Sequence, residues 1–147
     1  DIIYHEVIIE DFLNGISATK GNHSFIGMIQ STGENGQKVC LQENGAIKKI
    51  HKKIPPNEVY GESVGIQYFS KHISSKLFKT IKSFIDRGES SVYNDDAYNA
   101  LISEGELIYP FMFDSYPLAE LDTIEDYHQA QKVFKKPSFL KNYQFKS

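Results

Sequence analysis

Hydrophobic residues recur along this chain with two spacings, one typical of helices and one typical of strands. The helical spacing predicts four helices, over residues 5–13, 73–87, 95–104 and 123–136. A glycine just past the last periodic residue commonly ends a helix, so we expect the first three to stop at Asn14-Gly15, Gly88 and Gly105. Pro137 is expected to end the fourth, because proline cannot continue a helix.

The remaining apolar runs predict strands separated by turn residues. They cover residues 1–4, 24–30, 38–42, 46–50, 62–70 and 106–113, and the first is expected to be the end of a buried strand. Glu43-Asn44-Gly45 predicts a hairpin turn, because Asn-Gly adopts positive φ at little cost. Pro55-Pro56-Asn57 is expected to be a loop. This mixture of strands and helices predicts a layered α/β domain.

The segment around Asp122 combines a strand end with a helix start. Thr123 can cap the last helix, and Asp126 lies where the acid of a capping box would reach back. Asp122 falls at the carboxyl end of the preceding strand, which is where ligands bind in open α/β sheets. A carboxylate there can hold a divalent cation whose other ligands are phosphate oxygens and water. The alternative is that Asp122 only helps to cap the helix.

Charge and cysteine content narrow the class of protein. Sixteen basic and nineteen acidic residues give a formal charge of −3. That balance argues against a nucleic-acid partner, although Lys48, Lys49, Lys52 and Lys53 form a local basic cluster. No apolar run approaches the roughly 18 residues of a membrane-spanning helix, so no membrane partner is expected. The single cysteine, Cys40, excludes an intramolecular disulfide and predicts a cytoplasmic protein.

Four motifs are similar to those of nucleotidyltransferases of the phosphocholine and 2-aminoethylphosphonate cytidylyltransferase type. Their order and spacing agree with that family across nearly the whole chain. The motifs are Gly45-Ala46-Ile47-Lys48-Lys49-Ile50-His51-Lys52-Lys53, Gly61-Glu62-Ser63-Val64-Gly65-Ile66 with Phe69-Ser70, Val92-Tyr93-Asn94-Asp95-Asp96-Ala97, and Glu120-Leu121-Asp122-Thr123-Ile124-Glu125-Asp126-Tyr127.

The resemblance implies a Rossmann-like α/β fold of the GT-A type, with a layered sheet that is incomplete at its N-terminal side. It also implies a reaction, in which a phosphate or phosphonate oxygen attacks the α-phosphorus of an NTP and pyrophosphate leaves. CTP is the expected nucleotide. Two aspartates hold the catalytic magnesium in this family, and the matching positions are Asp1 and Asp122. Lys52 matches the catalytic lysine, which would neutralise the attacking phosphate.

The resemblance implies further substrate-binding residues, namely Lys53, Glu62, Tyr93, Asp96, Tyr116 and Glu120. Several have a structural alternative. Lys52 and Lys53 could be a solvated strand end. Glu62 could pair with a nearby lysine instead of binding a cationic or hydroxylated head group. Tyr93 and Tyr116 could be packed instead of forming the wall of an acceptor pocket. The chain has no tryptophan, which choline-handling members place before the closing motif, so the acceptor is left open.

The family's glycine-rich phosphate loop has no counterpart in these 147 residues, since Gly33-Glu34-Asn35-Gly36 is short and acidic. We therefore expect the C-terminal part of a nucleotidyltransferase domain over 1–136, a tail over 137–147, and a missing N-terminal half. Alone, the chain should be inactive. It should bind that half or self-associate through exposed strands of a parallel sheet, over 1–4 and 25–29. The rival hypothesis is a noncatalytic, degenerate domain that binds a ligand or a partner.

Overall fold

The computed structural model describes residues 2–19, 21–30, 36–89, 91–113 and 118–134. They fall into two compact units, of which the larger, Asn14–Asp114, carries the main sheet. The smaller unit combines Asp1–Leu13 with Ser115–Ser147, so it draws on both ends of the chain. We call them the sheet unit and the end unit.

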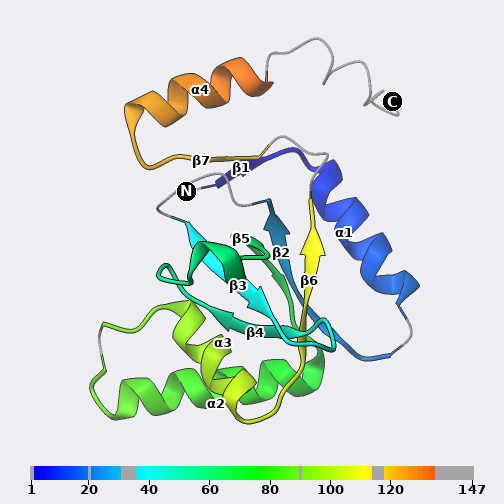
Figure 1. Cartoon of the computed structure of the whole chain (residues 1–147), viewed down its shortest axis with the longest axis vertical. Coiled ribbons are helices and arrows are strands. Elements are labelled where there is room, and N and C mark those ends of the chain that lie inside the picture. The colour runs from blue at the N-terminus through cyan, green and yellow to red at the C-terminus, as the bar shows by residue number, and fades with distance from the viewer. Residues whose placement is uncertain (1, 20, 31–35, 90, 114–117, 135–147) are drawn as a thin grey trace. The chain divides into compact units, whose positions relative to one another are not determined.

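The sheet unit is built on five strands in the order β4-β3-β5-β2-β6 (Figure 1). Among the described residues, β2 and β6 are parallel and the other three pairings are antiparallel. Gly45 turns β3 into β4 with a φ of +81°, which confirms the predicted hairpin. The strands, each close to a predicted one, are β2 (Ser24–Ile29), β3 (Gln37–Leu41), β4 (Ile47–Ile50), β5 (Gly61–Tyr68) and β6 (Ile108–Met112).

The position of β2 differs from the prediction. We expected residues 25–29 to form an exposed strand of a parallel sheet, but β2 lies between β5 and β6 in a mixed sheet. Phe25, Ile26 and Met28 are at most 7% exposed. The predicted exposure and the predicted parallel sheet are both wrong, and the reason is the same. A local hydrophobic pattern identifies a strand but does not show which strands lie beside it. The strands at the two edges of this sheet are β4 and β6.

Two helices close the core of the sheet unit. α2 (Lys71–Asp86) and α3 (Asn94–Ser103) pack against each other, and α3 also packs against β4 (Figure 1). Positive φ at Gly88 and Gly105 follows these helices, as predicted. Pro56–Glu58 forms a 3-10 helix, η1, where a loop was predicted. The core residues are Ile26, Met28, Val39, Ile47, Ile50, Ile73, Leu77, Ala97, Tyr98, Leu101 and Ile108.

The first helix, α1 (Val7–Ala18), continues through the predicted stop at Asn14-Gly15, so that prediction is wrong. Gly15 does not adopt a positive φ. A Cβ atom at this position would overlap the ring of Phe111 on β6. The glycine therefore serves close packing against the sheet, and only the tertiary structure shows this role.

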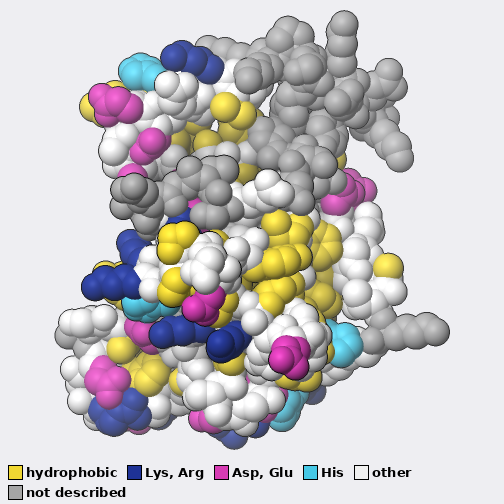
Figure 2. Space-filling model, in the orientation of Figure 1, with side chains coloured by type: hydrophobic (Ala, Val, Ile, Leu, Met, Phe, Trp, Pro, Cys, Tyr) yellow, Lys and Arg dark blue, Asp and Glu magenta, His cyan; other side chains and the backbone are white. Residues whose placement is uncertain are grey.

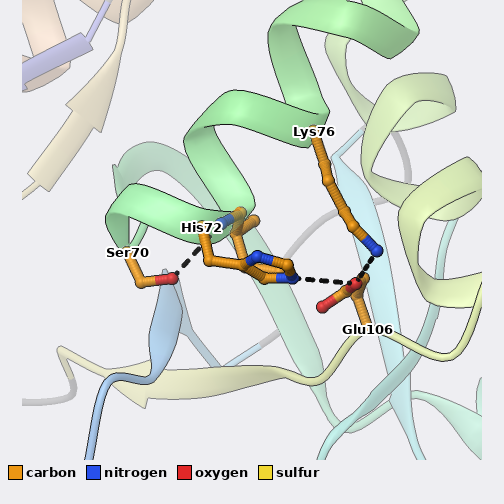
Figure 3. Close-up of polar contacts among 5 residues, drawn as sticks. Ser70, His72, Lys76 and Glu106 are labelled. Carbon is orange, nitrogen blue, oxygen red and sulfur yellow. Dashed lines mark hydrogen bonds and ion pairs between the residues drawn. The ribbon is translucent and has the colours of Figure 1, made fainter.

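Polar side chains tie the start of α2 to the turn between α3 and β6 (Figure 3). The Ser70 hydroxyl caps α2 by accepting a hydrogen bond from the Ile73 N–H at 3.3 Å. Glu106 accepts from Lys76 Nζ and also pairs with His72 Nε2 at 3.3 Å. The bond from Lys76, with a smaller contribution from His72, holds the pKa of Glu106 below its ordinary value of 4.5 although burial opposes the shift.

This lowered pKa predicts how acid affects the fold. A carboxyl group whose folded-state pKa is depressed stabilises the protein above its unfolded-state pKa and loses that effect as the pH falls through the folded-state value. We expect Glu106→Gln to make the free energy of unfolding less dependent on pH between about pH 6 and about pH 3. Urea denaturation across that range measures it. Glu104→Gln, an exposed acid two positions away, is the control, and equal slopes in wild type and Glu106→Gln would contradict the prediction.

In the end unit, β1 (Ile2–Tyr4) and β7 (Leu118–Glu120) pair antiparallel, with Ile2 opposite Glu120. α4 (Ile124–Phe134) follows β7. A strand forms over 2–4 as predicted. Ile3 and Tyr4 are exposed, which confirms the expectation of an exposed strand here, whereas the expectations of a buried strand and of a parallel sheet are wrong. The predicted helix stop at Pro137 lies outside the described residues.

Candidate acceptor site

A row of residues crosses the sheet unit at one level. Ile29, at the end of β2, lies opposite Glu62 on β5, and Glu62 lies opposite Lys38 on β3. The row extends past β4, because the His51 N–H donates to the Lys38 carbonyl at 2.8 Å. It thus lies at the carboxyl ends of β2 and β4. Because β2 and β4 run antiparallel to each other, their carboxyl ends point toward opposite edges of the sheet. The row is therefore a level within the sheet, and the candidate residues of this unit lie on or beside it.

Lys52 and Lys53 follow β4 in a turn that hydrogen bonds hold in place. The Ile50 N–H donates to Asn99 Oδ1 at 2.9 Å, and Asn99 Nδ2 donates back to the Ile50 carbonyl at 2.7 Å. The Lys53 N–H donates to His51 Nδ1 at 3.0 Å. Both lysine side chains are exposed, and Figure 2 shows basic side chains gathered over the β3–β4 region.

Four predicted site residues line a single pocket of about 210 Å³, which brings Lys52 and Lys53 together with Tyr93 and Asp96. The lysines come from the end of β4, and the other two come from the start of α3. Asp95, which the sequence reasoning did not single out, lines the same pocket. The pocket therefore has basic groups on one element and acidic groups on the other.

The two acids in the pocket have different surroundings. Asp96 Oδ2 accepts a hydrogen bond from the Tyr93 N–H at 2.7 Å, so Asp96 caps the start of α3. Asp95 is half-buried near Lys52. Burial raises the pKa of Asp95, the Asp96 carboxylate raises it further, and the Lys52 ammonium opposes both. A cationic ligand group beside Asp95 would favour its ionised form.

Glu62 is paired with a lysine. Its Oε2 atom lies 2.8 Å from Lys38 Nζ, and the two side chains are 13% and 9% exposed. Of the two alternatives for Glu62, the structure therefore contains the lysine pair. Gly36 lies against the Glu62 carboxylate, and a Cβ atom on Gly36 would overlap it. The carboxylate therefore fits here because position 36 is a glycine.

In the end unit, Asp126 and Thr123 form the predicted capping box. The Thr123 N–H donates to Asp126 Oδ2 at 2.9 Å, and the Asp126 N–H donates to Thr123 Oγ1 at 3.1 Å. The side-chain bond from Thr123 is the main cause of a lowered pKa for Asp126. Asp122 contributes only its backbone N–H to Asp126, at 3.2 Å. Within residues 118–134 and the other described ranges, no hydrogen bond or ion pair reaches the Asp122 carboxylate.

An exposed carboxylate such as this could serve as one ligand of a magnesium ion, which commonly takes one or two protein carboxylates and fills its remaining positions with water and phosphate oxygens. The described part of the chain contains no group of three or more His, Cys, Asp or Glu residues placed to hold a metal by themselves. Glu120 is exposed two residues before Asp122. The predictions for Asp1 and Tyr116 lie outside the described residues.

Solved structures with a related fold include several nucleotidyltransferases. The chain is similar to the CTP:phosphocholine cytidylyltransferase of Streptococcus pneumoniae, with a TM-score of 0.60 and 15% identity over 77% of this chain and 49% of that one. A proposed glucose-1-phosphate thymidylyltransferase of Bacillus anthracis gives a TM-score of 0.69 and 16% identity, over 100% and 54% of the two chains. The chain has the nucleotidyltransferase fold. The inositol-1-phosphate CTP transferase of T. maritima shares that fold, with a TM-score of 0.60 and 16% identity over 92% of this chain and 54% of that one.

This chain spans about half the length of each of these nucleotidyltransferases. No protein-family model matches its sequence. No curated protein matches it either. Among the described helices, none has the length and apolar character needed to cross a membrane.

Proposed function

We propose that this chain belongs to a magnesium-dependent nucleotidyltransferase that moves NMP from an NTP to a small phosphate or phosphonate acceptor. The observation that carries the proposal is the pocket at the end of β4, where Lys52 and Lys53 meet the acidic start of α3. The nucleotidyltransferase fold supports the reaction class. The sequence resemblance to cytidylyltransferases supports CTP as the nucleotide.

The proposed reaction needs no covalent enzyme intermediate. An acceptor oxygen forms a new bond to the α-phosphorus, the bond from that phosphorus to the bridging oxygen breaks, and pyrophosphate leaves. Lys52 would hold the acceptor phosphate and offset its charge, and Lys53 would add a second cation. Positioning and electrostatic stabilisation account for most catalysis in transfers of this kind.

The acidic side of the pocket indicates the class of acceptor. A ligand that carried only phosphate would gain from Lys52 and Lys53 but would be repelled by Asp95. A zwitterion, with an amine or quaternary ammonium a few bonds from its phosphate or phosphonate, complements both sides. The exposed ring of Tyr93 lines the same pocket, and an aromatic face attracts such a cation. We therefore propose an amino-phosphonate or a phospho-amino-alcohol as the acceptor.

In this proposal, Asp1 and Asp122 would hold the magnesium ion, which when bound would offset the negative charge of the nucleotide phosphates. The exposed carboxylate of Asp122, which has no hydrogen-bond partner among the described residues, supports its part. β1 and β7, the strands nearest to these two positions in the sequence, pair with each other. Glu120 and Tyr116 remain candidates for substrate binding in the same unit.

Calorimetric titration of the 147-residue chain with 2-aminoethylphosphonate, phosphocholine and inorganic phosphate tests the acceptor pocket. We expect Lys52→Glu to weaken the binding of all three probes by about tenfold or more, because a charge-assisted hydrogen bond is replaced by repulsion. Asp95→Asn should weaken the two zwitterions and leave phosphate binding unchanged or stronger. Lys49→Glu is the matched control, since Lys49 is an exposed lysine of the same hairpin and does not line the pocket.

Equal losses in Lys49→Glu and Lys52→Glu would show a general charge effect and contradict the proposed site. Failure of wild type to bind any probe would remove the acceptor pocket altogether. Binding of the zwitterions without nucleotidyl transfer by the complete gene product would favour the rival hypothesis of a noncatalytic, ligand-binding domain.

A further inference from the structure

We infer that Asn99 is a positioning residue, which sets the place of Lys52 and Lys53 and thereby controls acceptor affinity without touching the acceptor. Asn99 is not one of the residues that line the pocket. The inference rests on the proposed function for the identity of the acceptor. Its second readout, the hydrogen bonding of the lysine turn, does not depend on that identity.

The first argument is the way Asn99 completes an edge strand. β4 is at the edge of the sheet, and Ile50, its last residue, is fully buried. Buried backbone donors and acceptors need partners, and an edge strand has no neighbour to supply them. The Asn99 amide supplies both, at 2.9 Å and 2.7 Å, as a neighbouring strand would.

The second argument is that one helix carries both this amide and the acidic side of the pocket. Asp95 and Asn99 are four residues apart on α3, so they lie on the same helical face, one turn apart. Ala97, Tyr98 and Leu101 anchor that helix in the core. The amide therefore fixes the distance between the basic residues after β4 and the acidic residues at the start of α3.

The test uses three substitutions in the 147-residue chain. Asn99→Leu removes the donor and the acceptor, Asn99→Asp keeps the acceptor and places a carboxylate oxygen against the Ile50 carbonyl, and Asn99→Gln keeps both groups on a longer stem. Ser103→Ala, an exposed position on the same helix, is the control. The readouts are the affinity for 2-aminoethylphosphonate, amide hydrogen exchange at Ile50 and Lys53, and the free energy of unfolding.

We expect Asn99→Leu and Asn99→Asp to bind the probe about tenfold more weakly and to exchange the Ile50 and Lys53 amides about tenfold faster. The Val39 amide, inside the sheet, should be unaffected. Asn99→Gln should recover part of the affinity. If Asn99→Leu does not fold, Asn99→Asp decides.

A lower free energy of unfolding with unchanged affinity and unchanged exchange at Lys53 would make Asn99 merely structural and overturn the inference. A loss of affinity without faster exchange at Lys53 would overturn it as well. If wild type binds no probe, the proposed acceptor site fails, and exchange at Lys53 still tests whether Asn99 fixes the lysine turn.

Discussion

Replacing Asp122 with asparagine should lower the rate of nucleotidyl transfer by the complete gene product by about a hundred- to a thousandfold. The reason is that the neutral amide would bind a magnesium ion far more weakly than the carboxylate does. The Asp122 carboxylate takes no part in capping α4, so the free energy of unfolding should change little. Pyrophosphate release with CTP and 2-aminoethylphosphonate measures the rate, and urea denaturation measures the stability.

The neighbouring cap offers a matched contrast for that experiment. Asp126→Asn removes the charge of the capping box and should lower the free energy of unfolding. It should leave most of the transfer activity in place. If Asp126→Asn abolished transfer while Asp122→Asn retained it, the assignment of the two aspartates would be reversed. Equal and small effects on transfer would remove the metal role proposed for Asp122.

Replacing Glu62 with leucine should lower the free energy of unfolding by about 3–5 kcal/mol, because it leaves the Lys38 ammonium buried without its carboxylate partner. The pair is short, at 2.8 Å, and both side chains are largely buried. Replacing both residues with apolar ones of similar size, in Lys38→Met with Glu62→Leu, should recover most of the loss. Urea denaturation of wild type, both single variants and the double variant completes the cycle.

The double variant also separates the two alternatives for Glu62. If it is stable but has lost its affinity for the acceptor probes, the Lys38–Glu62 pair takes part in binding. If it is stable and binds as wild type does, the pair is structural only. A double variant as unstable as Glu62→Leu alone would contradict the account of the buried charge.

Features that depend on neighbouring residues were predictable from the sequence. The Asn44-Gly45 turn and the capping box of Thr123 and Asp126 both form as expected. In each case the residues that determine the geometry lie within four positions of each other, so their chemistry does not depend on the rest of the fold.

Features that depend on distant partners were not predictable in the same way. From the sequence alone, Gly15 indicates the end of a helix. Its packing role depends on Phe111, a residue much later in the chain that lies against it. β2 has the composition of any buried strand, and nothing in that composition shows that β6 returns parallel to it. Lys38 is the partner of Glu62 across 24 residues, and many other lysines could have filled that role from the sequence alone.

The candidate site lies between these two cases. The family resemblance identified the Tyr93–Asp96 stretch, but the acid that it indicated as substrate-binding was Asp96, which caps α3. Asp96 is the third residue of a helix that begins at Asn94, so the capping rule that explains Asp126 also explains Asp96 as a capping acid. Tyrosine is an unusual residue at the position before a helix, so the sequence does not show that Asp96 is a capping acid. Asp95 was therefore not predicted as the second acid of the pocket.

The pairing of β1 with β7 affects the order of folding. Every strand pairing of the sheet unit in the described residues lies within Asn14–Asp114, so that sheet can form without β7. β1 precedes all of these strands in the sequence, yet its partner, β7, follows all of them. Until β1 pairs with β7, the backbone donors and acceptors of β1 are open to chaperones and to other nascent chains. A segment made before the whole sheet unit is thus among the last to be folded.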